Sequence, residues 1–107
     1  MSATQEAPPA VNPEVKGGVT PYLTVDGAMK AADFYQRAFG ADLAAAHPAD
    51  DRGRTMHVHL YINGASVMLS DAYPEHGHPL EAPRGFNLTL QVDDIDARWK
   101  RPSTPWR

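Results

Sequence analysis

The stretch GFNLTLQVD (85–93) repeats the pattern of GVTPYLTVD (18–26), and this repeat indicates the class of fold. The glycine, the second leucine, the valine and the aspartate of the later stretch recur 67 positions after their equivalents in the earlier one. Both stretches alternate apolar and polar residues, which predicts strands with one buried face. The chain has 107 residues, so a second copy that begins at Gly85 has room for little more than a strand and the start of a helix.

A helix is predicted directly after the first strand. The strand covers Val19 to Val25, and Pro21 is typical of an edge or of a strand start. Asp26 is the expected N-cap of a helix over Gly27–Phe39, whose apolar residues recur at helical spacing. Gly40 follows as the expected C-terminal cap.

Three further strands are predicted after the helix. A short strand is expected at 42–47, and MHVHLYI (56–62) and ASVMLSD (65–71) alternate in the manner of half-buried strands. The dipeptide Asn63-Gly64 between the last two favours a two-residue hairpin turn. The fold class is therefore α+β. We expect a disordered leader at 1–17, a first unit at 18–71, a connecting loop at 72–84, an incomplete second unit at 85–101 and an irregular tail at 102–107.

The composition excludes several classes of protein. Hydrophobic residues make up 42% and charged residues 21% of the chain, with a net charge of -3, so no nucleic acid is an expected partner. The absence of cysteine excludes disulfides and thiolate chemistry. No apolar run approaches the roughly 20 residues of a membrane helix, and no signal peptide is recognisable, so a cytoplasmic location without membrane contact is expected. Phosphate-binding loops and nucleophile elbows are also missing.

Three stretches carry a resemblance to a known family. VTPYLTVDGAMKAADFYQRAFGA (19–41), HVHLYINGASVMLSD (57–71) and GFNLTLQVDDIDARW (85–99) resemble the glyoxalase/bleomycin-resistance/dioxygenase superfamily, or vicinal oxygen chelate fold, and its PhnB-like branch in particular. The resemblance implies paired βαβββ modules whose sheets curl around a cleft, here one module plus the first strand and part of the helix of a second. Because KRPSTPWR (100–107) replaces the rest of that helix, the chain is expected to be truncated or frameshifted.

The resemblance also bears on metal binding. In metal-dependent members the first strand of each module supplies a ligand, and those positions carry over to Thr20 and Asn87 here, which are neither histidine nor carboxylate. No cofactor is therefore expected. A divalent metal remains the minor alternative, because His57 and His59 share one face of a strand and two imidazoles can reach one ion. Two surface or ligand-contacting histidines are the other interpretation.

The strand faces opposite the helix are the expected small-molecule site. They gather hydroxyl, amide, imidazole and aromatic groups, as ligand pockets do. An ordinary solvent-facing sheet surface is the alternative. The candidate catalytic groups are His57, His59 and Tyr61. The expected ligand-binding residues are Thr20, Tyr22, His57, His59, Tyr61, Met68, Ser70, Asn87, Thr89 and Gln91.

Three functional hypotheses follow. The first is a metal-free protein that binds a small molecule in a cleft formed by paired modules of a homodimer, with exchange of the segment 85–92 as one option. The second is a superfamily enzyme, such as a lyase, isomerase or transferase acting on a small oxygenated or antibiotic-like substrate. The third is an inactive fragment with unpaired strand edges. The fold alone does not decide among them.

Overall fold

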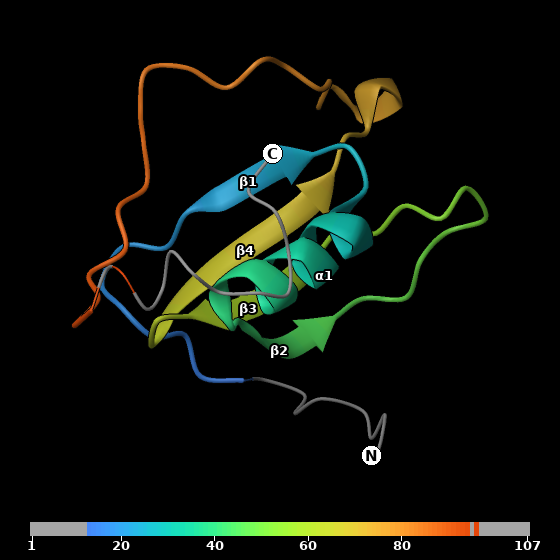
Figure 1. Cartoon of the computed structure of the whole chain (residues 1–107). Coiled ribbons are helices and arrows are strands. Elements are labelled where there is room, and N and C mark those ends of the chain that lie inside the picture. The colour runs from blue at the N-terminus through green and yellow to red at the C-terminus, as the bar shows by residue number, and fades with distance from the viewer. Residues whose placement is uncertain (1–12, 95, 97–107) are drawn as a thin grey trace.

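A computed structural model describes residues 13–94 and 96 of the chain. One four-stranded sheet carries one helix on one of its faces (Figure 1). The elements are β1 (Tyr22–Val25), α1 (Ala28–Phe39), β2 (Asp42–Ala46), β3 (Val58–Ile62), β4 (Ala65–Asp71) and a 3-10 turn, η1 (Pro74–His76). This is a single βαβββ module, so the predicted α+β class and the order of the elements are confirmed. In the part of the chain that the structure describes, no helix is both long and apolar enough to span a membrane.

The strands are ordered β1-β4-β3-β2, so β1 and β2 are the edges. The strand β1 runs parallel to β4, whereas β2 and β3, and β3 and β4, pair antiparallel. Pro21 directly precedes the edge strand β1, as predicted. The β3–β4 turn has Asn63 at φ 53° and Gly64 at φ 82°, the positive values that a two-residue hairpin requires.

The core lies between α1 and the sheet. Val58, Leu60 and Leu69 are fully buried on the helix side, against Ala28 and Ala32 of α1, which are also fully buried. Two alanines on the packed face let the helix backbone approach the sheet closely, while valine and leucine fill the space between the layers. The other face of the sheet therefore keeps the polar residues of the alternating pattern.

The start of α1 corrects one prediction. Asp26 is not the cap: Gly27, at φ 91°, holds the N-cap position, and no side chain of its own caps the helix. Instead, Asp71 at the end of β4 accepts hydrogen bonds from Gly27 N (2.7 Å) and Ala28 N (3.0 Å). Its second oxygen accepts from Thr55 N at 2.9 Å. A long-range carboxylate thus satisfies the free amides of the first turn. Gly40 caps the other end at φ 69°, as predicted.

The segment 85–92 differs from its prediction. It forms no strand, and among the described residues it makes no backbone hydrogen bond with the sheet. Its tie to the module is a bond from the Asn63 side-chain amide to the carbonyl oxygen of Gln91. A strand exists only as part of a ladder, and this segment lies over the helix side of the sheet instead of along its edge. The helix predicted after Asp94 falls largely on residues outside the described part.

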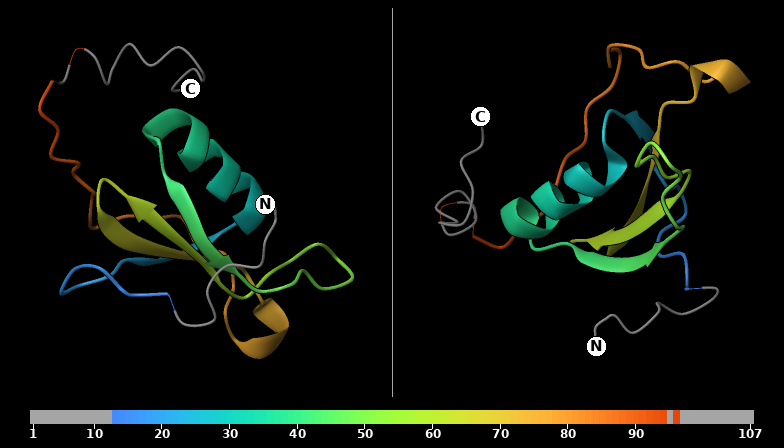
Figure 2. Two further views of the ribbon diagram at one scale, coloured as in Figure 1. Left: turned by 90° about the horizontal axis from the view of Figure 1, so that it is seen from below. Right: turned by 90° about the vertical axis from the view of Figure 1, so that its right-hand side faces the viewer.

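The last residues of the predicted leader are described and lie on the sheet. Lys16 N donates to Ser66 Oγ at 2.8 Å, and Ser66 N donates to Lys16 O at 2.9 Å. Figure 2 shows that these first described residues, in blue, lie on the side of the sheet away from α1, whereas the orange segment near 86–91 passes on the side of α1. Residues 1–12 of the predicted leader lie outside the described part. Thus α1 and the segment near 86–91 lie on one face of the sheet, and the first described residues lie on the other.

Candidate functional site

The strand register gathers a row of polar and aromatic side chains on the face opposite α1. Tyr22 of β1 lies beside Met68 of β4, and Met68 lies beside His59 of β3. Along the same face, Tyr61 pairs with Ser66. Six of the residues predicted to bind a ligand share this surface, which we call the polar face: Tyr22, His57, His59, Tyr61, Met68 and Ser70.

Tyr22 and His57 form a hydrogen-bonded pair at the open end of the polar face. Tyr22 Oη lies 2.9 Å from His57 Nδ1 and 2.9 Å from the carbonyl oxygen of Met56. The phenol has one proton; if it donates to Met56 O, then Nδ1–H of His57 donates to Tyr22 Oη. Burial raises the pKa of Tyr22, so the phenol stays protonated near neutral pH. The pair therefore offers neutral donors and acceptors to a bound molecule.

The charge state of His57 is set by its surroundings. Removal from water lowers its pKa, and the neighbouring imidazoles of His47 and His59 lower it further. The ring centroids of His47 and His57 are 5.1 Å apart, and those of His57 and His59 are 6.4 Å apart. His57 is therefore a neutral imidazole over most of the physiological range.

His59 lies in the covered part of the polar face. It is only 1% exposed, its Nε2 is 2.7 Å from Ser66 Oγ, and burial lowers its pKa. Its ring meets Tyr61 edge to face, with centroids 5.0 Å apart. Tyr61 Oη in turn donates to Glu14 O at 2.6 Å. All three candidate catalytic groups thus have protein partners: His57 contacts Tyr22, His59 contacts Ser66, and Tyr61 contacts Glu14.

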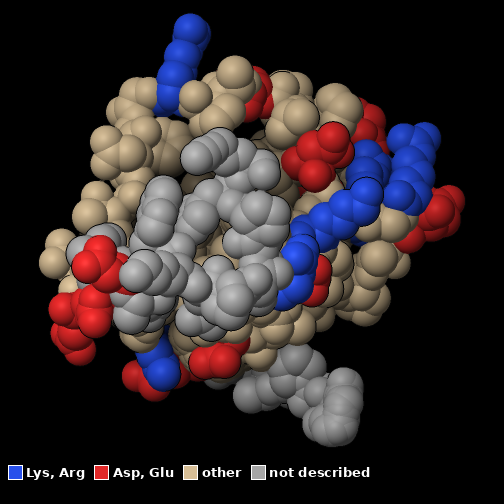
Figure 3. Space-filling view, viewed as in Figure 1, with Lys and Arg blue, Asp and Glu red and all other residues tan. Residues whose placement is uncertain are grey.

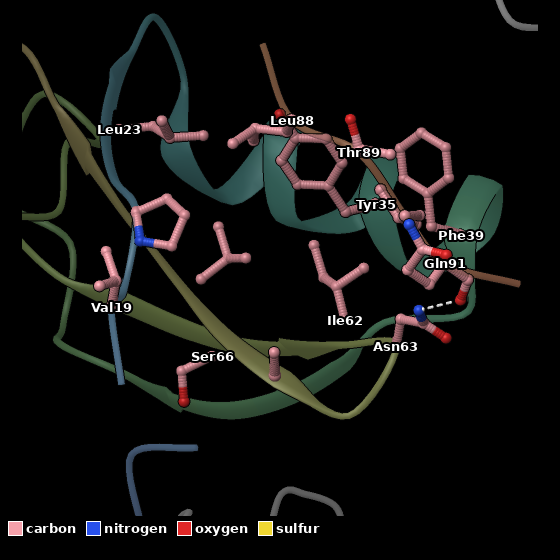
Figure 4. A pocket seen from close by; sticks show the side chains of 14 residues that line it. Val19, Leu23, Tyr35, Phe39, Ile62, Asn63, Ser66, Leu88, Thr89 and Gln91 are labelled. Carbon is pink, nitrogen blue, oxygen red and sulfur yellow. Dashed lines mark hydrogen bonds between the residues drawn. The ribbon is translucent and has the colours of Figure 1, made fainter. Parts of the chain in front are cut away.

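The remaining predicted residues do not join this surface. Thr20 precedes β1 and is half-buried, and Asn87 is exposed. Thr89 and Gln91 line a cavity of about 580 Å³ on the α1 side of the sheet. In Figure 4 the apolar side chains of Leu23 and Ile62 lie in this cavity, with the segment 88–91 along its rim. Within one chain, the predicted residues therefore divide between two sides of the sheet.

The donor set of the polar face does not match a metal site. Among the described residues, no three histidine or carboxylate side chains are grouped so that they could hold a metal ion. The Nε2 atom of His59 is engaged with Ser66 Oγ, and the first-strand position implied by the resemblance is Thr20. Serine and threonine hydroxyls are weak ligands for the transition metals that imidazole binds.

Two features of the site were not predicted from the sequence. The expected ligand-binding residues do not include Ser66, although the alternation of ASVMLSD places it on the same side as Met68 and Ser70. The pairing of Tyr22 with His57 joins residues 35 apart in sequence, and no local pattern indicates it. On the face that Figure 3 shows, acidic and basic side chains lie close to one another.

Similar proteins of known structure share this architecture. Protein PA1353 from Pseudomonas aeruginosa superposes with a TM-score of 0.62 and is 30% identical, over 78% of this chain and 66% of that chain. TioX from Micromonospora sp. ML1 has a TM-score of 0.53 at 24% identity, over 79% of this chain and 68% of that chain. The second likeness concerns the fold alone.

The chain also resembles two mycobacterial proteins in sequence and matches the model of one family. Uncharacterized protein Mb0911c of Mycobacterium bovis and uncharacterized protein Rv0887c of Mycobacterium tuberculosis are each 38% identical over 93 residues, which is 81% of this chain. The chain spans 60% and 54% of their respective lengths. The model of the Glyoxalase/Bleomycin resistance protein/Dioxygenase superfamily matches residues 18–103. With a βαβββ module in the structure and a family match over most of its length, the chain belongs to this superfamily.

Proposed function

We propose that this protein binds a small organic molecule on the polar face, without a metal ion, and that a partner copy completes the cleft. The observation that carries the proposal is the Tyr22–His57 pair, with Met68 and Ser70 beside it, on a face that the helix does not cover. Ligand sites combine apolar and aromatic surface with a few placed polar groups, and this surface has that composition.

The chemistry of the open half of the polar face favours a neutral ligand. His57 is uncharged near neutral pH and Tyr22 is protonated, so both supply hydrogen bonds without charge. Met68 adds a flexible, polarizable contact for an aromatic ring. A flat molecule with one or two hydrogen-bonding groups, such as a phenol or an aromatic amide, fits this set best. Metal-free binding is supported by the lack, among the described residues, of three grouped histidine or carboxylate side chains that could hold an ion.

Partner association is supported by the segment 85–92. It repeats the sequence pattern of β1 but has no ladder in the described chain, and it leaves Phe86 57% and Leu88 49% exposed. The outer edge of β1 carries no paired strand either in the described part of the chain. A homodimer in which two copies exchange this segment would pair such groups. Light scattering of the full chain should therefore give the mass of a dimer.

Removal of residues 85–107 should convert that dimer to a monomer. An unchanged dimer would remove the segment from the proposed interface. Aggregation of the full chain that grows with concentration would instead favour the inactive-fragment hypothesis, because unpaired edges and exposed apolar residues drive it.

Binding is tested by a matched pair of tyrosine variants. A collection of phenols and aromatic amides is screened by amide chemical shifts, and the affinity of each hit is measured calorimetrically. Tyr22→Phe should weaken a hit on the polar face roughly fivefold, the usual effect of one lost hydrogen bond. Tyr35→Phe, on α1, is the control and should leave the affinity unchanged. Equal losses in both variants, or shifts confined to the α1 side, would contradict the proposed site.

The enzyme hypothesis has one supporting observation. The 2.9 Å contact between Tyr22 Oη and His57 Nδ1 is a path along which a proton can move between a phenol and an imidazole. If the protein is a lyase, isomerase or transferase, this pair and not the buried His59 would be accessible to substrate. Turnover of a bound compound that His57→Gln abolishes, with binding retained, would favour the enzyme over the binding protein.

A further inference from the structure

Residues 14–17, which we call the N-terminal strap, lie across part of the polar face. The backbone of Lys16 exchanges two hydrogen bonds with Ser66: Lys16 N to Ser66 Oγ at 2.8 Å, and Ser66 N to Lys16 O at 2.9 Å. Glu14 O accepts a hydrogen bond from Tyr61 Oη at 2.6 Å. The ammonium group of Lys16 stands 4.3 Å from the centre of the Tyr61 ring, in a cation–π contact.

The strap divides the polar face into two halves. The covered half holds His59 and Ser66, which are each only 1% exposed although they lie on the side of the sheet away from α1. The open half holds Tyr22, which is 52% exposed, with His57 beside it. Packing of α1 on the sheet explains the burial of the side that faces the helix. The buried residues on the opposite side, His59 and Ser66, coincide instead with the contacts of the strap.

We propose that the N-terminal strap determines which ligands the polar face accepts. With the strap in place, a ligand is confined to the open half around Tyr22, His57 and Met68. A ligand long enough to reach His59 binds only when the strap leaves, and its polar groups then replace those of Lys16 and Glu14. This inference rests on the proposed function of the polar face, and it gives the size limit of the ligand.

The contacts of the strap are suited to such an exchange. They are a few hydrogen bonds to side-chain and backbone groups of the sheet, and the strap residues belong to no strand of the structure. The Val15 side chain is 51% exposed, so it does not anchor the strap in a core. Gly17, the last residue of the strap, has φ 105°, a conformation that other residues rarely adopt.

Two neighbouring glycines provide a matched pair of variants. At Gly17 an added Cβ would meet atoms only at 3.8 Å and beyond, so Gly17→Ala strains the backbone without a clash. Gly18 has no positive φ, and nothing lies within 4 Å of an added Cβ, so Gly18→Ala is the control. The strain of an alanine at positive φ should raise the open fraction of the strap roughly tenfold or more.

The opening is measured without any ligand, by ethoxyformylation of histidines with diethyl pyrocarbonate. In the unaltered protein the exposed His47 should react and His59 should not. In Gly17→Ala the rate at His59 should rise roughly tenfold, along with hydrogen exchange of the Ser66 amide, while Gly18→Ala matches the unaltered protein. Unchanged amide signals of Leu60 confirm that the fold is intact.

Two outcomes would overturn the inference. One is a rate at His59 as high as at His47 in the unaltered protein. The other is equal protection of His59 in both glycine variants. If Gly17→Ala does not fold, Lys16→Ala removes the cation–π contact alone and should raise the rate at His59 about twofold or more. An unaltered rate in that variant would then count against the strap.

The size limit is tested with 4-phenylphenol, an elongated two-ring probe. It should shift the amide signals of His59 and Ser66 in Gly17→Ala but only those near Tyr22 and Met68 in the unaltered protein. The same pattern in both proteins, including no shift in either, would refute the size limit. The labelling experiment needs no ligand, so a strap that opens as expected can be separated from a polar face that binds nothing.

Discussion

Replacement of Asp71 by asparagine should destabilise the module, because one buried carboxylate holds three of its segments together. Asp71 is only 5% exposed, and its two oxygens accept hydrogen bonds from Gly27 N, Ala28 N and Thr55 N at 2.7, 3.0 and 2.9 Å. It fastens the start of α1 and the chain that enters β3 to the end of β4. These segments are distant in sequence, so no local interaction can replace the carboxylate.

The size of the effect follows from the number of bonds that survive. An asparagine can present its oxygen to Gly27 N and Ala28 N, but its NH₂ group then faces the Thr55 N–H, donor against donor. One bond to a charged acceptor is lost, worth about 1.5–3 kcal/mol, and the other two lose their charge assistance. We expect the free energy of unfolding to fall by about 2–3 kcal/mol. For Asp71→Ala, which loses all three bonds, we expect about 4 kcal/mol or more.

Urea denaturation followed by circular dichroism measures both variants. Asp26→Asn is the control, because Asp26 is exposed and caps nothing in the structure, so its effect should stay within about 0.5 kcal/mol. The reasoning is refuted if Asp71→Asn costs less than about 1 kcal/mol, or if Asp26→Asn costs as much as Asp71→Asn. The second result would mean that the negative charge of Asp26 stabilises the start of α1 as much as the bonds of Asp71 do.

Three further predictions concern pH, the hairpin and an ion pair. Desolvation lowers the pKa of His57 and His59 in the folded state. Their contribution to stability is therefore full above about pH 6.5 and is lost as the pH falls through the lowered pKa values. The melting temperature of His59→Gln should accordingly depend less on pH, between about 7 and 5, than that of the unaltered protein. Gly64→Ala, at φ 82°, should lower the free energy of unfolding by about 1 kcal/mol in the same urea assay. Arg54 lowers the pKa of Glu75 to about 2 through paired hydrogen bonds, so Arg54→Lys should raise it toward about 4.3 in an NMR titration.

The parts of the fold that were predicted correctly depend on local chemistry. The turn at Asn63-Gly64 and the cap at Gly40 each require positive φ at a known position, and the residues that tolerate it are visible in the sequence. The helix before Gly40 and the strands on either side of the turn follow from apolar spacing. These features need no knowledge of distant residues, which is why one sequence was enough to place them.

The parts that differ depend on distant partners. The amides at the start of α1 are capped by Asp71, more than 40 residues away, and an equally reasonable local candidate stood at Asp26. The segment 85–92 has the composition of a strand, but a strand forms only when its backbone pairs with another strand, and pairing is not a property of composition.

The sequence predicted which side chains of the candidate site share a face of the sheet, but not which of them are buried. Alternation placed His57, His59 and Tyr61 on the polar face correctly, because side chains two apart in a strand share a side. The burial of His59 was not predictable, because the strap that contacts the neighbouring Ser66 and Tyr61 has no periodicity in its sequence. The contact of Tyr61 with Glu14 spans 47 residues and uses a backbone oxygen, which any residue could have supplied.

Segments near both ends of the described chain contact the β3–β4 hairpin, from opposite sides of the sheet. Lys16 is bonded to Ser66 on one side of the sheet, and Gln91 is bonded to Asn63 on the other (Figure 1). The path of the chain through the module is therefore nearly a closed ring. Such a ring can be opened elsewhere: a circular permutant that joins these ends by a short linker and begins within the exposed turn at Asp51 would keep every strand pairing and the carboxylate bonds of Asp71. A folded permutant would show that the architecture of the module does not depend on the order in which the chain connects its elements.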